Sequence, residues 1–345
     1  MPFDDSYGSA YTKGRVTLDD VAQEAGVSTM TVSRVVRGMD KRVTRETTKR
    51  VQAIIDRLGY QPDMLAKGLR GDPTLTIGLM LSRIGGYFFG ECVGHIDELA
   101  QNAGYSLILA GSHEYAQSEL EQFQMLMARR IDGLLIIPTP GRDQFLKTAL
   151  ALGFPIVAFE REDPNVLIDT VYVENRSGAK RAVEHLLQHG HRRIACVSNE
   201  SAYYTITDRI RGYQEAMSEA GLEALILQGS DKESLGIELS RAFLAIDPPT
   251  ALFTTNGDLT LQVLPVLAAH KLSIPKDIAL IGFDDFAAAP FLSTPMTTIR
   301  VPTKELGTKA FELLLKRITA TKRVSTCKIA LPTELVVRQS CGCPM

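Results

Sequence analysis

TLDDVAQEAGVSTMTVSRVVR, residues 17–37, decides the fold of the first part of this chain. It opens with Thr17 and Asp20 at the spacing of a helix-capping pair, followed by apolar residues that share one face of a short helix. Gly26 then permits a positive φ, and Ser28 can cap a second helix directly after the turn. The stretch therefore predicts two helices joined by a tight turn.

The surrounding residues extend this stretch to a small three-helix domain. Ala22 is small enough to let the two helices cross closely, and Val32 anchors the second helix against the first. Thr44 can cap a third helix over residues 45–58, in which apolar residues recur at core spacing. Three helices around one core predict a compact all-α unit.

The second helix leaves a polar surface on its outer face, made of Thr29, Met30, Ser33, Arg34 and Arg37. Such a surface suits the major groove of DNA, where arginine can bond a guanine edge and threonine or methionine can touch thymine methyl groups. Arg34 is the best candidate for reading a base. The alternative is that the two helices are an ordinary hairpin within a larger core.

The charge distribution separates this first part from the rest of the chain. Residues 13–71 contain 12 lysines and arginines against 7 aspartates and glutamates, a net charge of +5, whereas the whole chain has a formal net charge of −2. The remainder is therefore acidic. A small basic unit on a larger acidic one is expected when only the first unit meets a polyanion such as DNA.

The opening VTLDDVAQEAGVSTMTVSRVVRG, residues 16–38, resembles the lactose-repressor (LacI/GalR) family of DNA-binding regulators. The resemblance continues through residues 43–71 and implies a third helix followed by a hinge helix. It implies that Leu69 inserts into the minor groove, with Ala66 packed beside it, and an apolar wedge of this kind bends the duplex. The full set of expected DNA contacts is Thr17, Ser28, Thr29, Met30, Thr31, Ser33, Arg34, Arg37, Ala66 and Leu69.

From residue 76 onward, short apolar runs alternate with helical stretches. The runs are TIGLML, YSLILAG, DGLLIIP, FPIVAF, RRIACVS, TALFTT and DIALIGFDD. The segments between them are long enough to cross between parallel strands, so the pattern predicts two doubly wound sheets of about five strands each. The family resemblance extends through LPTELVVRQS, residues 331–340, and implies a two-lobed sensor.

The expected fold class is an all-α helix-turn-helix DNA-binding domain plus an α/β two-lobed periplasmic-binding-protein-like sensor domain. We predict a disordered leader at residues 1–14, the DNA-binding domain at 15–60, a hinge helix and linker at 61–73, and a two-lobed ligand-binding and dimerisation domain at 74–340.

The resemblance also implies a ligand site between the lobes. Asp284, at the end of a buried strand, is expected to bond sugar hydroxyls, although it could be a structural cap. Arg209 is placed at the start of a helix as the ligand arginine, with a surface ion pair as the alternative. Tyr87 and Phe88 form an expected aromatic wall, or an ordinary core pair. The remaining expected ligand contacts are Arg161, Thr205 and Asn256.

Catalysis and membrane association have little support in the sequence. The chain lacks the phosphate-binding, dinucleotide-binding and nucleophile motifs of common enzyme families. Asp284 and Asp285 are adjacent residues at a strand end, so they should face opposite sides of the strand rather than act as an acid and base pair. We expect no catalytic residues. No segment approaches the roughly 20 apolar residues that span a bilayer, so we expect a cytoplasmic protein.

The cysteines do not suggest a disulfide framework or a metal site. Five cysteines, an odd number, are mostly scattered, so reduced thiols are expected. Cys341-Gly-Cys343 does not match the usual zinc-ligand spacings and is given no role. We therefore expect no metal and no cofactor.

The predicted function is transcription regulation by a homodimer on double-stranded operator DNA, because one helix-turn-helix reads only a half-site and a two-fold dimer matches a palindrome. A small-molecule effector, a sugar or sugar acid, is expected to relieve repression. The alternatives are a co-repressor-dependent regulator that responds to a non-sugar metabolite, and a sugar-binding protein without a role on DNA.

Overall fold

The computed structural model describes residues 16–36, 38, 42–60, 73–141, 143–163, 165–199, 203–320 and 325–343. The chain divides into two compact units, Met1–Thr74 and Leu75–Met345. The predicted leader at 1–14 and residues 61–72 of the predicted hinge lie outside the described residues.

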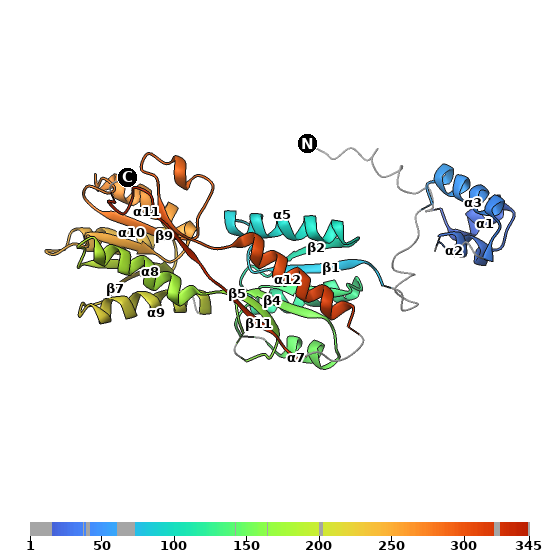
Figure 1. Cartoon of the computed structure of the whole chain (residues 1–345), viewed down its shortest axis with the longest axis horizontal. Coiled ribbons are helices and arrows are strands. Elements are labelled where there is room, and N and C mark those ends of the chain that lie inside the picture. The colour runs from blue at the N-terminus through green and yellow to red at the C-terminus, as the bar shows by residue number, and fades with distance from the viewer. Residues whose placement is uncertain are drawn as a thin grey trace, which may run out of the picture. The chain divides into compact units, whose positions relative to one another are not determined.

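The described part of the first unit contains three helices, drawn in blue in Figure 1: α1 (Leu18–Ala25), α2 (Thr29–Val36) and α3 (Arg45–Leu58). Val21, Val32 and Val51, one from each helix, are fully buried in a common core. The predicted helix-turn-helix and the predicted bounds of the third helix are confirmed.

Local side-chain bonds fix the ends of these helices. Thr17 and Asp20 form a capping box, with the Asp20 backbone N–H donating to Thr17 Oγ1 over 3.2 Å. Gly26 ends α1 at a φ of 62°, a conformation that costs other residues free energy. Ser28 Oγ then accepts from the backbone N–H of Thr31, which starts α2. The turn is therefore encoded locally.

The second unit has two lobes. Lobe 1 comprises residues 75–173 and 303–331, and lobe 2 comprises residues 174–300 and 334–343. The strands of lobe 1 are β1 (Thr76–Leu81), β2 (Ser106–Gly111), β3 (Gly133–Ile136), β4 (Ile156–Glu160), β5 (Asp169–Val173) and β11 (Lys328–Leu331). The strands of lobe 2 are β6 (Ile194–Asn199), β7 (Leu225–Gly229), β8 (Ala251–Thr254), β9 (Ala279–Phe283), β10 (Thr297–Arg300) and β12 (Glu334–Val336).

The two sheets have equivalent strand orders, β11-β5-β4-β3-β1-β2 and β12-β10-β9-β8-β6-β7. Within the described residues each sheet has six strands rather than the expected five or so, because the C-terminal segment adds β11 to lobe 1 and β12 to lobe 2. The paired strands run parallel, except that β12 is antiparallel to β10. The prediction of two doubly wound sheets is confirmed, with an extra edge strand on each.

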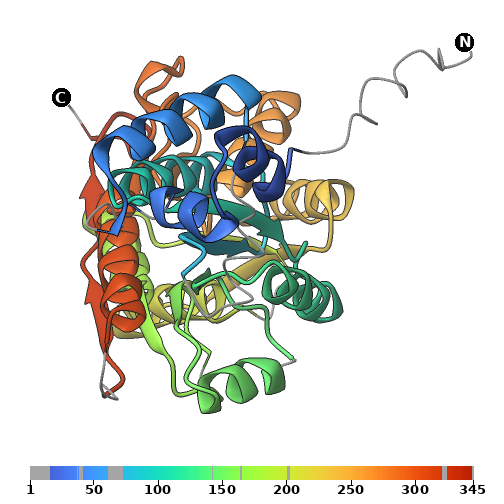
Figure 2. The ribbon, with the colours of Figure 1, turned by 90° about the vertical axis from the view of Figure 1, so that its right-hand side faces the viewer.

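Helices cover both faces of each sheet (Figures 1 and 2). The helices of lobe 1 are α5 (Tyr87–Asn102), α6 (Ala116–Ala128), α7 (Gln144–Ala151) and α12 (Thr303–Ile318, red in Figure 2). The helices of lobe 2 are α8 (Asn175–Gln188), α9 (Tyr204–Glu219), α10 (Lys232–Phe243) and α11 (Gly257–Ala269), and the short 3-10 helix η3 is Ala289–Phe291. No helix among the described residues is both long and apolar enough to cross a bilayer.

Alternating strand residues explain why both faces are covered. In β3, Leu135 packs in the core shared with α5 and α12, whereas Leu134 and Ile136 pack against α6 and α7. In β6, Cys196 faces α8 and α9, whereas Val197 faces α10 and α11. Strands buried on both sides read as continuous apolar runs.

Three connections in the described chain join the lobes: from β5 to α8, from β10 to α12, and from β11 to β12. They lie side by side, because Val173 pairs with Leu331 at the end of lobe 1 and Arg300 pairs with Glu334 at the end of lobe 2. The carboxyl ends of the parallel strands of both lobes border a common cavity.

Candidate functional site

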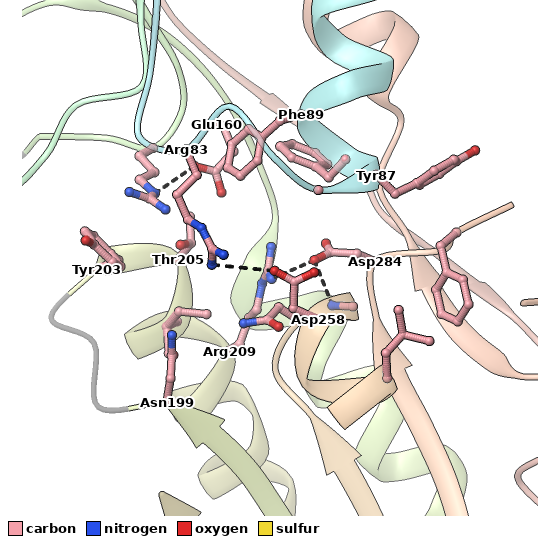
Figure 3. A pocket seen from close by; sticks show the side chains of 18 of the residues that line it. Arg83, Tyr87, Phe89, Glu160, Asn199, Tyr203, Thr205, Arg209, Asp258 and Asp284 are labelled. Atoms are coloured by element: carbon pink, nitrogen blue, oxygen red, sulfur yellow. Dashed lines mark hydrogen bonds and ion pairs between the residues drawn. The ribbon is translucent and has the colours of Figure 1, made fainter. Parts of the chain in front are cut away.

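A cavity of about 160 Å³ lies between the two lobes. Its walls come from the residues that follow β1, β2 and β4 in lobe 1 and β6, β8 and β9 in lobe 2. Each of the seven predicted ligand contacts lines it: Tyr87, Phe88, Arg161, Thr205, Arg209, Asn256 and Asp284. The structure therefore brings the predicted set together, and Figure 3 shows these walls with their polar side chains.

Arg209 is held rigidly on the lobe 2 side. It lies in the second turn of α9, not at the helix start, and is 4% exposed. Its Nε donates to Asn175 Oδ1 over 2.8 Å, and its Nη1 donates to the Thr255 carbonyl oxygen over 2.7 Å. The guanidinium also stacks on the Phe283 ring, with Cζ 3.7 Å from the centroid. Arg209 is thus a buried, oriented donor and not part of a surface ion pair.

Asp284 presents an unsatisfied oxygen. It follows β9 at a φ of 72°, which is uncommon for a residue other than glycine. Its Oδ2 lies 3.5 Å from Arg209 Nη1 and 3.3 Å from the Gly257 nitrogen at the start of α11. Its Oδ1 is buried and has no hydrogen-bond partner among the described residues. One oxygen therefore bonds the start of a helix, and the other is available for a donor that the described residues do not supply.

Glu160 occupies the equivalent place in lobe 1. It ends β4, the strand equivalent to β9, also at a positive φ, 66°. Burial raises the pKa of Glu160, which weakens its tendency to ionise. Arg161 Nε lies 3.0 Å from Glu160 Oε2, but neither atom has an aligned hydrogen bond within the described part of the chain. Both groups can still bond a ligand.

Arg161 also contacts lobe 2. Its Cζ lies 3.9 Å from the centroid of the Tyr203 ring, and its Nη2 lies 3.7 Å from Glu114 Oε1. Burial raises the pKa of Tyr203, so its hydroxyl stays neutral. The arginine therefore spans the cleft between two lobes.

Aromatic rings form the wall near the start of α5. Phe88 and Phe89 meet edge to face with centroids 5.3 Å apart. Tyr87 is 43% exposed, and its hydroxyl donates to Glu91 Oε1 over 2.5 Å, which with burial raises its pKa to about 12. Such rings provide a flat apolar surface for one face of a ligand.

The remaining predicted contacts contribute less. Asn256 Oδ1 accepts from the backbone N–H of Leu259 and caps α11, and the residue also lines the cavity. Thr205 is 4% exposed in the first turn of α9. Asn256 is thus partly a structural residue.

Asp285 also borders the cavity, but its carboxylate is used internally. It accepts hydrogen bonds from Arg338, Thr298 and Arg300. Burial raises its pKa, yet these bonds outweigh burial and leave the pKa below its ordinary value. Asp284 and Asp285 both follow β9 rather than lie in it, so the strand-alternation argument does not apply to them, and the bonds to Asp285 are what separates their roles.

Several cavity residues are not in the predicted set. They include Arg83, Phe89, Glu114, Glu160, Asn199, Tyr203 and Asp258. Glu160 directly precedes the predicted Arg161, and Asp258 follows the predicted Asn256 by two positions, so both adjoin motifs that the sequence already indicates.

The predicted DNA contacts of the first unit lie on or near α2. Met30 is 61% exposed and Thr29 is exposed at the start of the helix, whereas Arg34 is half-buried. The Thr31 hydroxyl lies 3.0 Å from that of Ser28 and takes part in the cap. The Thr17 hydroxyl is engaged by Asp20. Arg37, Ala66 and Leu69 lie outside the described residues.

Comparison with known proteins agrees with both units. Residues 17–63 match the family model of bacterial regulatory proteins, lacI family, and residues 183–341 match a periplasmic binding protein-like domain. The chain is 33% identical to an HTH-type transcriptional repressor PurR of Photobacterium profundum, over 94% of this chain and 98% of that relative.

Solved structures of regulators are similar along nearly the whole chain. The lac repressor dimer bound to operator and the anti-inducer ONPF is 26% identical, with a TM-score of 0.80 over 94% of this chain and 99% of that one. The transcriptional regulator CelR in complex with cellobiose is 28% identical, with a TM-score of 0.66 over 94% and 100%. This chain belongs to the lacI family of bacterial regulatory proteins and is a DNA-binding transcriptional regulator.

Proposed function

We propose that this protein is a cytoplasmic repressor that binds a palindromic operator as a homodimer and releases it when a small sugar or sugar acid occupies the cavity between the lobes. The observation that carries the effector assignment is the buried Asp284 Oδ1 without a partner, next to the oriented guanidinium of Arg209. A hydroxyl both donates and accepts, so vicinal hydroxyls match an adjacent acceptor and donor.

Charge balance favours a neutral sugar over an acid. Each arginine of the cavity already lies within 4 Å of a carboxylate: Arg83 of Asp258, Arg161 of Glu160, and Arg209 of Asp284. An anionic ligand would have to compete with these carboxylates for the arginines. A neutral ring with several hydroxyls can bond both kinds of group and stack its apolar face on the aromatic wall.

The DNA-binding role is assigned to α2. Its exposed first turn would enter the major groove with Thr29 and Met30. The half-buried Ser33 and Arg34 follow in the next turn, and Arg34 would read a guanine. The basic first unit would supply attraction to phosphates. The related lac repressor was solved as a dimer on its operator, which supports a two-fold arrangement here.

Coupling would run through residues 61–73, which we assign to the hinge helix and linker between a DNA-binding domain at 15–60 and a sensor at 74–340. A ligand that binds one arrangement of the lobes more tightly shifts the population toward it. The factor by which the effector changes operator affinity cannot exceed the ratio of its affinities for the two lobe arrangements.

The experiment is selection of DNA from a random pool by the purified protein, repeated with a panel of neutral sugars, sugar acids and non-sugar metabolites. Enrichment of a palindrome that a neutral sugar abolishes supports the proposal. A sugar that sharpens enrichment makes the effector a co-repressor, and a response only to a non-sugar compound contradicts the effector class. An enriched site that no compound alters leaves DNA binding intact and contradicts the sensor role of the cavity.

A further inference from the structure

Two histidines and a cysteine converge at the far end of α8 from the cavity. His185 lies in the last turn of α8 and His189 is the C-cap residue of that helix, with ring centroids 4.5 Å apart. Cys343 Sγ lies 3.2 Å from His185 Nε2 and 3.0 Å from His189 Nε2. The three candidate ligand atoms all lie within 4.8 Å of one another. In sequence, Cys343 is 158 positions from His185 and 154 positions from His189.

A second cysteine adjoins this group. Cys341 is fully buried, and its Sγ lies 3.1 Å from that of Cys343. Gly342, between them, has a φ of 84°, which allows the chain to turn so that both sulfurs face α8. The cluster thus contains one sulfur and two imidazole nitrogens, and Cys341 beside it can supply the second sulfur of the ligand set found in many structural zinc sites.

The backbone that carries the cysteines is fixed to the sheet of lobe 2. The Thr297 backbone N–H donates to Ser340 Oγ over 2.8 Å, and that hydroxyl donates to the Leu280 carbonyl oxygen over 2.5 Å. The Leu280 N–H in turn donates to the Ser340 carbonyl over 2.8 Å. The cysteines are therefore presented by an ordered segment, and little chain entropy would be lost when a metal binds.

The histidine chemistry is also set for a metal. His189 Nδ1 lies 2.8 Å from the His185 carbonyl oxygen, which can only accept, so Nδ1 carries the proton. Nε2 of His189 is then the nitrogen with the lone pair, and it is the atom that faces Cys343. A ring nitrogen bonded to a backbone carbonyl is the usual second-sphere support of a metal-binding histidine.

We propose that His185, His189, Cys343 and Cys341 bind one zinc ion that joins α8 to the C-terminal segment. Zinc–sulfur bonds of about 2.3 Å and zinc–nitrogen bonds of about 2.0–2.1 Å give a tetrahedron with edges of about 3.3–3.8 Å. The three edges at Cys343, now 3.0–3.2 Å, must lengthen by about half an ångström to reach these values. Cys341 lies outside the group of ligand atoms within 4.8 Å of one another, so its side chain must also move toward the histidines.

The absence of a zinc motif in the sequence follows from the fold. The spacing of Cys341 and Cys343 matches no common zinc motif, and their partners at the end of α8 are more than 150 residues away. The site would link lobe 2 to the segment that returns from lobe 1 through β12.

The test is metal analysis of the full-length protein, purified under reducing conditions with any affinity tag removed. After exposure to zinc and dialysis, wild type should retain about one zinc per chain. Cys343→Ser and His189→Asn should bind zinc at least tenfold more weakly. The matched controls Cys327→Ser and His113→Asn change an exposed cysteine and an exposed histidine outside the cluster and should bind as wild type does.

Cobalt(II) gives an independent reading of the ligands. The cobalt form should show thiolate charge-transfer absorption and tetrahedral ligand-field bands, and Cys341→Ser should lose about half of the charge-transfer intensity. Wild type without retained zinc, or unchanged affinity in both Cys343→Ser and His189→Asn, would overturn the site. Unchanged charge transfer in Cys341→Ser would remove Cys341 from the ligand set. Circular dichroism separates loss of metal from loss of fold.

Discussion

Arg83 of lobe 1 and Asp258 of lobe 2 face each other across the cavity, with Nη1 of the arginine 3.6 Å from Oδ2 of the aspartate. Both side chains are about half exposed, 55% and 52%. The pair therefore connects the lobes through an ionic contact that water can replace, which suits a cleft that opens and closes (Figure 3).

Arg83→Ala and Asp258→Ala should each weaken binding of the effector found in the panel by about two- to fivefold, because an exposed pair contributes about 0.2–1 kcal/mol to closure. The double variant should be no weaker than either single variant. Calorimetric titration of the three variants measures this. Additive losses would mean that each residue contacts the ligand separately.

Asp284→Asn should abolish most effector binding while leaving the fold intact. Asparagine tolerates the positive φ and keeps an acceptor toward Gly257, but it loses the charge, and a hydrogen bond to a charged group is worth about 1.5–3 kcal/mol. Affinity should fall about 10- to 100-fold. Asp247→Asn is the control, because Asp247 is a 79% exposed carboxylate away from the cavity. Equal affinity of the two variants would contradict the role of Asp284.

Arg34→Ala should relax base preference at one position of each half-site by about 1–3 kcal/mol. Lys49→Ala changes an exposed cation on α3 and should weaken all sequences alike while lowering the salt slope. Binding to a set of single-base operator variants distinguishes the two. An unchanged ranking of operators in Arg34→Ala would remove Arg34 as the reading residue.

Gly212→Ala should destabilise lobe 2 and impair the cavity together. A Cβ at Gly212 on α9 would lie 2.1 Å from the Arg176 carbonyl oxygen of α8, so the helices would have to separate. The same helices carry Asn175 and Arg209, which bond each other. We expect a loss of about 1–3 kcal/mol or more in the free energy of unfolding.

Gly236→Ala is the matched control for this substitution. It also lies within a helix, α10, but an added Cβ meets nothing within 4 Å, so the change should stabilise the protein by about 0.4–1 kcal/mol. Denaturant unfolding measures both. A Gly212→Ala protein as stable as Gly236→Ala would contradict the close packing of α8 and α9.

Stability should fall as the pH rises through 7, because of Glu119. This residue is 1% exposed, and burial raises its pKa to about 7, despite the 2.7 Å bond from the Thr139 nitrogen that favours ionisation. A pKa that is raised in the folded state stabilises the protein fully at pH values below the unfolded pKa near 4.5. This contribution to the free energy of unfolding, roughly 3 kcal/mol, is lost as the pH rises to about 7.

Glu119→Gln keeps the acceptor for Thr139 and removes the titration. The difference in unfolding free energy between the variant and wild type should therefore widen from pH 5 to pH 8 in favour of the variant. Denaturant unfolding at several pH values measures it. A difference that stays constant across this range would place the titration elsewhere.

The helix-turn-helix could be predicted closely because its signals are local: Thr17, Gly26 and Thr44 each act on residues within one turn of helix. The cavity residues Arg209 and Asp284 were predicted through the family resemblance. Tyr203 carries no local sequence signal, because its contact with Arg161 comes from the other lobe. The strands β11 and β12 are short and half-exposed, so no apolar run marks them. The cluster around Cys343 depends on a tertiary contact that spacing cannot reveal.

The three adjacent connections between the lobes have a mechanical consequence. A single tether would let one lobe swing, twist or slide against the other in any direction. Three adjacent connections define one hinge axis, because rotation about the line through them bends all three equally. Any other motion of the lobes stretches at least one of them. Ligands of different shape therefore change only the angle of this rotation. The part of lobe 1 farthest from the axis moves the greatest distance, because displacement grows with distance from the axis.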